Sequence, residues 1–516
     1  MTGPEKRHFT LFSQRHIIGP ENNYLRLFDA MDAQKDYDED AILEKFANEK
    51  FAKQLHRIKN YLYELILRSL AEFHKNKTIG GEIRSKLESA EILFAKGLPV
   101  QANKILTAVR ELIEIYEQPH FWPELLELEK KYLNYLSGNQ DFSELIDEHS
   151  NQFRLAQEQL GELNSNWENA ARVSTRLNAF GLPQNETERQ KLIEIFKESI
   201  SNPGELHGFD SREYYFQNCS HFYHLLGDLE QAFTFSGQHI DWYQEHEFFI
   251  RDRLRRYVAV LTNHLLLAIR LGKRDERYEE LRLKLFSIGE TYSNSPHNTR
   301  EFQWHLFRAK TSVILYELLS CHPTQNPQVS LRELENEFAG FGKYTLTGRR
   351  AGFLFNMARV SLVYEDFIRA NKFLNLIINS GPDAGGEIFH EANLLSLVVF
   401  FESGKMELIK PRIKQMRRFC QAEIARSEAV EILLSLFWDL AGTRKNKSGA
   451  PDLFNNALNN LEFAFKNNPI DRGLAWFDYF SWLESRTENK PIREIIFAKI
   501  EAGNYTFPYP SEVFSP

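Results

Sequence analysis

Three side chains that can bind a metal ion lie close together in the segment Cys219-Ser-His221-Phe-Tyr-His224. If this segment is helical, His221 and His224 share one face and both imidazoles can reach a single ion. Zinc needs three or four ligands. Cys219, two residues from His221, points to the other side of the helix, and no second cluster accompanies the pair. We therefore interpret these histidines as core or interface residues and predict no metal site.

Other spacings that are typical of catalysis are incomplete. Glu387 and His390 have the Glu-x-x-His spacing of di-iron bundles, which need two such motifs on facing helices. The second occurrence, from Glu117 to His120, contains Pro119. The sequence has no Gly-x-x-x-x-Gly-Lys-Ser/Thr phosphate loop and no Gly-x-Ser-x-Gly elbow. We predict a non-enzymatic protein with no catalytic residues and no cofactor, although a site assembled from distant residues leaves no mark in a sequence.

Two groups of basic residues could hold an acidic peptide through charge-assisted hydrogen bonds. In the run Arg251-Asp-Arg-Leu-Arg255-Arg, residues Arg251 and Arg255 are one helical turn apart. Lys410, Lys414 and Arg417 form a second stripe at helical spacing. The alternative is that both groups lie on a solvated outer face.

Composition limits the classes of partner and the cellular location. The 516 residues carry a net charge of −8, which makes a nucleic-acid partner unlikely on electrostatic grounds. Three widely spaced cysteines, Cys219, Cys321 and Cys420, are typical of a reducing compartment. The N-terminus lacks the apolar core of a signal peptide, and the most apolar stretch, 394–401, is too short to span a bilayer. We expect a cytoplasmic protein without a membrane anchor.

The elements that must position these residues are helical hairpins. A turn signal recurs every 38 to 49 residues between segments with helical apolar spacing, which is about the length of two helices and two loops. This periodicity predicts an all-α fold, an α-solenoid of about nine stacked antiparallel hairpins. The turns fall near Gly97, Gly138, Gly181, Gly227, Gly272, Cys321, Glu365, Gly404 and Gly442.

Three of these windows resemble the tetratricopeptide repeat. The residues that carry the resemblance are Tyr223, Gly227, Asp228 and Ala232; Ala90, Gly97, Ala102, Leu106 and Val109; and Ala358, Ala370, Leu374, Ile377 and Pro382. Short side chains let the two helices of a hairpin approach closely. The period here is longer than the family's period of about 34 residues, and the windows at Gly138, Gly181 and Gly272 lack the alanine. The sequence is similar to a divergent member of that family.

The resemblance implies a function in protein interaction. In the tetratricopeptide family the inner face of the first helices often binds a peptide, and one subgroup clamps a terminal carboxylate with Asn and Lys or Arg. Asn218 and Asn356 fall at equivalent positions, and Arg359 lies one turn beyond Asn356. The alternative is an Asn on a solvated helix face. The identity of the protein or peptide partner and the oligomeric state stay open.

Four parts are expected along the chain. They are an irregular segment 1–20, an N-terminal helical bundle or cap 21–80 with Asp38 as a helix N-cap, the solenoid 81–470, and a capping helix with a Pro-rich aromatic tail 471–516. The bundle suggests a second hypothesis. A helix bearing His56, Arg57 and Lys59 after a short turn could bind nucleic acid as a helix-turn-helix, in a regulator whose solenoid senses a peptide. The acidic run 36–39 argues against it.

Overall fold

The fold is described from a computed structural model of the whole chain. It describes all residues except 15–21, 35–36, 50–52, 76, 137–142, 181–185, 202–205, 207, 294, 296–297, 321–325, 342–346, 382–385, 420–426, 443–449, 468–473, 475, 503–504 and 506–516. Every regular element in the described ranges is a helix, so the predicted all-α class is confirmed.

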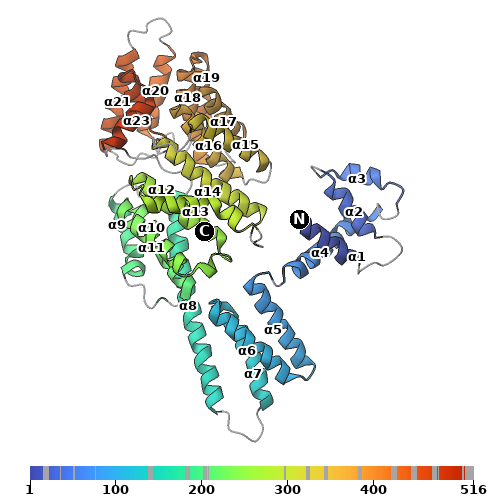
Figure 1. The fold of residues 1–516 in the computed structure, drawn as a ribbon. Helices are drawn as coiled ribbons and strands as arrows, with labels where there is room; N and C mark the ends of the chain where they lie inside the picture. The colour runs from blue at the N-terminus through green and yellow to red at the C-terminus, as the bar shows by residue number, and fades with distance from the viewer. Residues whose placement is uncertain are drawn as a thin grey trace. The chain divides into compact units, whose positions relative to one another are not determined.

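The helices follow one another in short connections (Figure 1). They are α1 Gly3–Gln14, α2 Asn23–Asp32, α3 Glu39–Lys45, α4 Leu55–His74, α5 Ile79–Ala95, α6 Pro99–Ile115, α7 Trp122–Leu136, α8 Ser143–Phe180, α9 Glu186–Ser201, α10 Gly208–Leu225, α11 Leu229–Glu245, α12 Leu254–Arg270, α13 Glu276–Thr291, α14 Arg300–Leu319, α15 Pro327–Phe341, α16 Thr347–Val363, α17 Phe367–Asn379, α18 Gly386–Glu402, α19 Ile409–Phe419, α20 Glu428–Leu440, α21 Ala450–Asn467, α22 Tyr479–Thr487 and α23 Ile492–Glu501. Single 3-10 turns precede α7, α12 and α19.

The chain divides into two compact units, Met1–Leu160 and Gly161–Pro516, called unit 1 and unit 2 below. Unit 1 has two separate apolar cores, one formed by α1 to α4 and the other by α5 to α8. The division between the units falls inside α8 and inside the range 81–470 that the sequence assigns to the solenoid.

The prediction that residues 1–20 are irregular is wrong for Gly3–Gln14, which form α1. Phe9 and Phe12, three residues apart, are buried in the first core of unit 1, and His8 hydrogen-bonds Ser69 of α4 at 3.1 Å. The helix depends on these tertiary contacts, since its own apolar stripe is short. The predicted N-cap is confirmed, because the Asp38 carboxylate accepts a hydrogen bond from the Ala41 amide at 3.1 Å.

Most of the predicted turns lie between paired helices. Gly97, Gly227, Gly272 and Gly404 have φ between 69° and 77°, and Glu365 has φ of 59° at the corresponding turn. This left-handed conformation ends a helix because it directs amides back to the last carbonyls. A turn also follows α20 at Gly442. The predicted turns at 138, 181 and 321 lie outside the described residues.

One long helix replaces an expected pair. The turn spacing implies two helices between residues 138 and 181, whereas α8 runs unbroken from Ser143 to Phe180. Its sequence contains no proline, and Gly161 is the one glycine between its ends. A single glycine costs a helix only about 1 kcal/mol, so nothing in the local sequence ends it.

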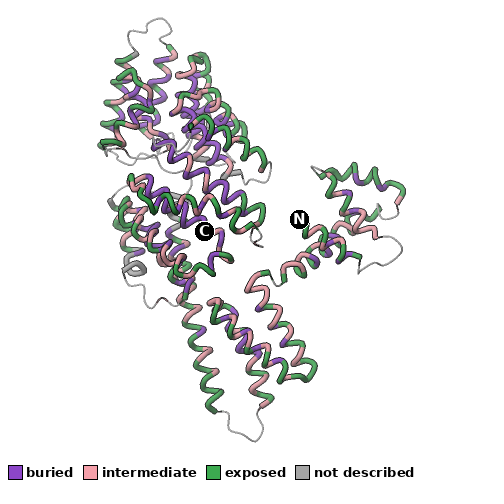
Figure 2. Tube along the Cα trace, in the orientation of Figure 1, coloured by how far each residue is buried: buried purple, intermediate pink, exposed green. Residues whose placement is uncertain are grey.

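Hairpins follow one another in unit 2. Helices α10 to α19 form five of them, in which α10, α12, α14, α16 and α18 are the first helices. Consecutive first helices from α12 to α18 also pack against one another. Figure 2 shows α12 and α14 buried along most of their length, while α13 and α15 keep an exposed side. The first helices therefore form the inner layer of unit 2.

Candidate functional site

The predicted amide and guanidinium residues lie in the middle of first helices. Asn218 on α10 is 3% exposed, and on α16 Asn356 is 3% and Arg359 is 1% exposed. The alternative that these asparagines sit on a solvated helix face is therefore wrong. Apolar periodicity alone does not tell a buried asparagine from a solvated one here. The reason is that other helices cover both faces of a first helix in unit 2, so a polar position can also be buried.

Buried polar atoms without a partner concentrate on these first helices. Among the described residues, the Oδ1 atoms of Asn218 and Asn356 and the Oγ1 of Thr311 on α14 have no hydrogen-bond partner. Leaving such an atom unpaired costs about 1–3 kcal/mol, so most proteins contain few of them. Each of these three atoms has the capacity to form one more hydrogen bond.

Arg359 is the most unusual member of this set. Its one hydrogen bond within the described residues runs from Nη1 to the Trp476 carbonyl oxygen at 3.3 Å, while Nε and Nη2 are buried and unpartnered. The guanidinium lies 5.3 Å from the centre of the Tyr316 ring. No carboxylate of the described residues forms an ion pair with it. The sequence predicted Arg359 as a site residue, but gave no signal for Trp476, which is 117 positions away.

The predicted pair Arg251 and Arg255 does not form one helical face. Arg251 lies in a turn, because α12 begins only at Leu254. Arg255 forms an ion pair with Glu301 at 3.0 Å, and both side chains are well exposed. The pairing prediction is wrong because it assumed that the helix starts before the arginine run.

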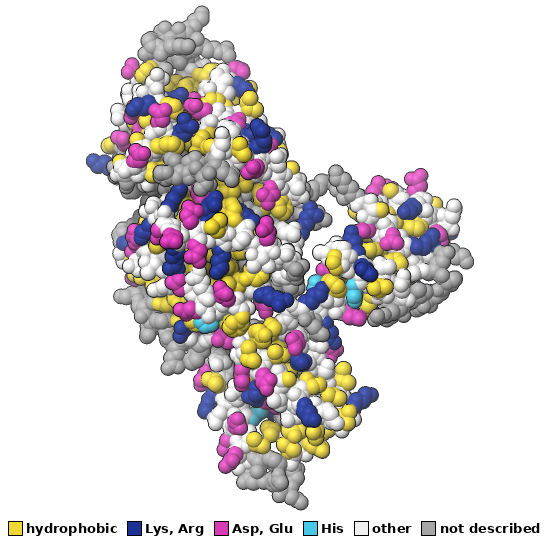
Figure 3. Space-filling model, in the orientation of Figure 1, with side chains coloured by type: hydrophobic (Ala, Val, Ile, Leu, Met, Phe, Trp, Pro, Cys, Tyr) yellow, Lys and Arg dark blue, Asp and Glu magenta, His cyan; other side chains and the backbone are white. Residues whose placement is uncertain are grey.

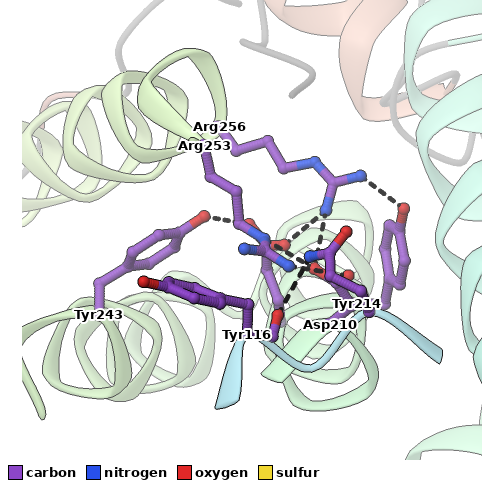
Figure 4. Close-up of polar contacts among 8 residues, drawn as sticks. Tyr116, Asp210, Tyr214, Tyr243, Arg253 and Arg256 are labelled. Atoms are coloured by element: carbon purple, nitrogen blue, oxygen red, sulfur yellow. Dashed lines mark hydrogen bonds and ion pairs between the residues drawn. The ribbon is translucent and has the colours of Figure 1, made fainter. Parts of the chain in front are cut away.

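The other two arginines of that run bind carboxylates of α10 instead. The Arg253 side chain donates from Nε and Nη2 to the two carboxylate oxygens of Asp210 at 2.9 and 3.0 Å (Figure 4). Arg256 donates to Glu213 at 2.6 Å and to the Tyr214 hydroxyl at 2.7 Å. The contacts connect α12 and the residue before it to α10.

Glu213 is the centre of this network. Its side chain is 2% exposed, and the Tyr243 hydroxyl of α11 donates to it (Figure 4). Burial raises the pKa of Glu213, and the attraction of Arg256 opposes the rise. Since its donors come from α11 and α12, the carboxylate joins three helices. Because its hydrogen bonds connect these helices, we assign it a structural role.

Burial keeps four histidines of unit 2 uncharged at neutral pH. Burial lowers the pKa of His221 to about 4 and that of His224 to about 3. His239 and His264 are likewise lowered to about 3 by burial. The interpretation as a core residue is confirmed for His221, which is 5% exposed, whereas His224 is half-buried. Burial raises the pKa of the Cys219 thiol to about 12, so it is not a ready nucleophile.

Neither metal motif is completed by the fold. In the described ranges no three or more His, Cys, Asp or Glu side chains come together in a way that could hold a metal ion. His390 lies on α18, where burial lowers its pKa, and the side chain of Glu387 lies outside the described residues.

Three of the remaining predicted basic residues, Lys59, Lys410 and Arg417, have partners within their own unit. In unit 1, Lys59 donates to Glu39 at 2.7 Å and to the Tyr37 hydroxyl at 3.0 Å. On α19 of unit 2, Arg417 pairs with Glu431 at 2.9 Å and the Lys410 ammonium lies 5.0 Å from the Trp438 ring centre. Figure 3 shows basic and acidic side chains interspersed on the visible face of each unit. These contacts weaken both surfaces as anion-binding patches.

Comparison with protein-family models, with characterised proteins and with solved structures finds no match to this chain. The resemblance to the tetratricopeptide repeat therefore stays a prediction. No described helix combines the length and the apolar character that crossing a bilayer requires.

Proposed function

We propose that this protein is a non-enzymatic scaffold in which unit 2 holds an extended segment of a partner protein against its first helices. The hairpins α10 to α19 would form a tetratricopeptide-like solenoid in a cytoplasmic protein. The observation that carries the proposal is the series of unpartnered buried groups on α10, α14 and α16. A peptide backbone offers both donors and acceptors, so it can pair with amide, hydroxyl and guanidinium groups alike.

The chemistry of the series favours a peptide over a small apolar ligand. The Oδ1 atoms of Asn218 and Asn356 accept hydrogen bonds, whereas the free nitrogens of Arg359 donate them. The groups come from helices α10 and α16, which are separated by several elements in the chain. An extended chain, which spans about 3.3 Å per residue, can contact groups on successive helices.

The first prediction concerns Asn356→Leu. Leucine is close to asparagine in shape, so replacing an unpaired amide removes a desolvation cost, and we expect stability to stay equal or rise. Partner capture should fall at least tenfold, since a ligand loses its hydrogen bond. The measurements are affinity capture from a lysate of the native cell and thermal unfolding of the purified variant.

Asn371→Leu is the matched control. Asn371 on the second helix α17 also has an unpartnered Oδ1 in the described structure, but outside the first helices. It should change stability in the same direction and leave capture unchanged. If both variants retain capture, the first helices are not the binding surface and the proposal fails.

A further inference from the structure

The last turns of α10 and α12 are joined by a hydrogen bond that only a neutral histidine can make. Arg270 Nη1 donates to His224 Nε2 at 3.2 Å. A guanidinium offers donors only and is not deprotonated in proteins. The Nε2 atom of His224 is therefore an unprotonated acceptor, and the ring carries its single proton on Nδ1.

Protonation of His224 turns this hydrogen bond into a repulsion. An imidazolium has an N–H on both ring nitrogens, so Nε2 can no longer accept, and two positive groups would then lie 3.2 Å apart. Burial, followed by the charge of Arg270 and the neighbouring His221 ring, lowers the pKa of His224 to about 3. The packed arrangement therefore opposes proton uptake, and a bound proton favours separation of the two turns.

Within the described residues no carboxylate pairs with His224 to compensate an added charge. Helices α8 and α9 pack against α10 with apolar side chains. The two acids at the start of α11 are engaged elsewhere, since Asp228 accepts from the backbone amide of Gln231 at 3.0 Å and Glu230 forms an ion pair with Lys273. The charged group that faces the His224 ring is thus Arg270 of α12, and the titratable neighbour on α10 itself is His221.

His224 is closer to solvent than the other histidines of these helices. It is half-buried, whereas His221, His239 and His264 are 5%, 4% and 4% exposed. A small separation of the turns after α10 and α12 is enough to hydrate the His224 ring. Hydrating the other three rings requires opening of the core between α10, α11 and α12, so His224 is the first of the four to take up a proton.

We propose that the hydrogen bond between Arg270 and His224 is a proton-sensitive latch, which holds the turn after α10 against the turn after α12 at neutral pH and releases it in acid. The ion pair of Lys273 and Glu230 also joins the two turns, but its side chains are 38% and 63% exposed, and exposed pairs contribute little. The latch is a property of the fold and does not depend on the partner proposed above.

Hydrogen exchange of the full chain at pH 7 and pH 5, followed by mass spectrometry and corrected for intrinsic rates, tests the latch. An opened state in which His224 regains its ordinary pKa of about 6.5 gains roughly twentyfold in population between these two pH values. We expect peptides from 219–232 and 264–276 to exchange faster by that factor, while peptides from 392–402 of α18 change much less. No rise in the wild-type protein would overturn the proposal.

His224→Gln is the test variant, and His390→Gln is the matched control. The Oε1 atom of glutamine can accept from Arg270 at either pH but takes up no proton, so exchange in this variant should change by less than about threefold between pH 7 and pH 5. His390 is likewise half-buried with a pKa lowered by burial, but it lies on α18, so its replacement should leave the wild-type rise intact. If His224→Gln keeps the full rise, another group controls the opening and the proposal fails.

Arg270→Gln keeps the proposal testable if His224→Gln does not fold. The glutamine amide can still donate to His224 Nε2 but carries no charge, so the ring should take up a proton more readily in the folded protein. The exchange rise at 219–232 should then be smaller than in the wild-type protein. The His224 titration, followed by NMR of the ring Cε1 proton in histidine-labelled protein, should move to higher pH, and an unchanged titration would show that Arg270 does not oppose the proton.

Discussion

Several carboxylates of low exposure in unit 2, such as Glu213 and Glu317, bind one aromatic donor and one arginine. Glu317 on α14 is 2% exposed and accepts from the Tyr278 hydroxyl at 2.7 Å. It also binds Arg282, which lies one helical turn after Tyr278 on α13. Burial by itself lowers the pKa of Arg282, but the hydrogen bond to Glu317 outweighs this effect and the pKa is raised.

The arrangement recurs at the C-terminal end of unit 2. The Trp482 indole donates to Glu402 at 2.7 Å, and Arg486, one turn later on α22, donates to the other carboxylate oxygen at 3.1 Å. Burial raises the pKa of Glu402, and the attraction of Arg486 opposes the rise. In both places a pair of donors on one helix fastens a carboxylate on another.

The second prediction is made at Glu317. Glu317→Ala leaves a half-buried guanidinium and a buried hydroxyl without an acceptor, so we expect a loss of about 3–5 kcal/mol. Urea unfolding followed by circular dichroism measures it. As a control, Glu301→Ala removes an ion pair of which the carboxylate is 69% exposed, and it should cost about 0.5 kcal/mol or less. Similar losses in the two variants would contradict the expectation that the buried contacts of Glu317 stabilise the fold more than the exposed ion pair of Glu301.

At the scale of elements, a residue with a left-handed backbone ends the first helices α10, α12, α16 and α18. Gly272 ends α12 with φ of 69°, and nothing lies within 4 Å of the Cβ that a substitution would add. At the corresponding turn after α16, Glu365 adopts φ of 59° although it has a side chain. Glu365 therefore carries the strain of a left-handed backbone that Gly272 avoids.

The third prediction uses this contrast. Gly272→Ala should cost about 1–2 kcal/mol, because only the left-handed backbone penalty applies. Glu365→Gly should stabilise, by up to about 1 kcal/mol, since the glycine relieves that penalty but adds entropy to the unfolded chain. Thermal and urea unfolding of both variants measure the changes. A loss of stability in Glu365→Gly would mean that its side chain makes a stabilising contact.

At the scale of the whole molecule, sensitivity to acid belongs to unit 2. Four histidines whose pKa values fall to about 3 or 4, at 221, 224, 239 and 264, all lie in it. A histidine kept neutral in the fold takes up a proton more readily when unfolded. Its contribution to the free energy of unfolding is therefore complete above the unfolded pKa of about 6.5. That contribution is lost as the pH falls from 6.5 toward the pKa of the folded state.

The fourth prediction follows from this loss of stability at low pH. Between pH 7 and pH 5 each histidine removes at most about 2 kcal/mol of stability, while the raised pKa of Glu213 works in the opposite direction. Hydrogen exchange with mass spectrometry should show peptides from 209–270 losing protection at pH 5, after correction for intrinsic rates. Peptides from 83–128 of unit 1 serve as the internal reference. Equal losses in both sets would place the acid sensitivity elsewhere.

The sequence by itself determined the all-α class and the positions of most turns. Helical periodicity and turn residues are local properties, so they are visible in the order of residues. Long-range effects were missed. The helix Gly3–Gln14 depends on contacts with α4, and α8 continues where the spacing implied a break.

Only the tertiary structure decided which polar residues are satisfied. Arg253, Arg256 and Arg359 look alike in the sequence, yet the first two bind acids of α10 and the third keeps Nε and Nη2 unpartnered within the described residues. The difference depends on which side chain of a distant helix comes within about 3 Å. That distance is set by how the helices pack, and burial then makes the missing partner costly.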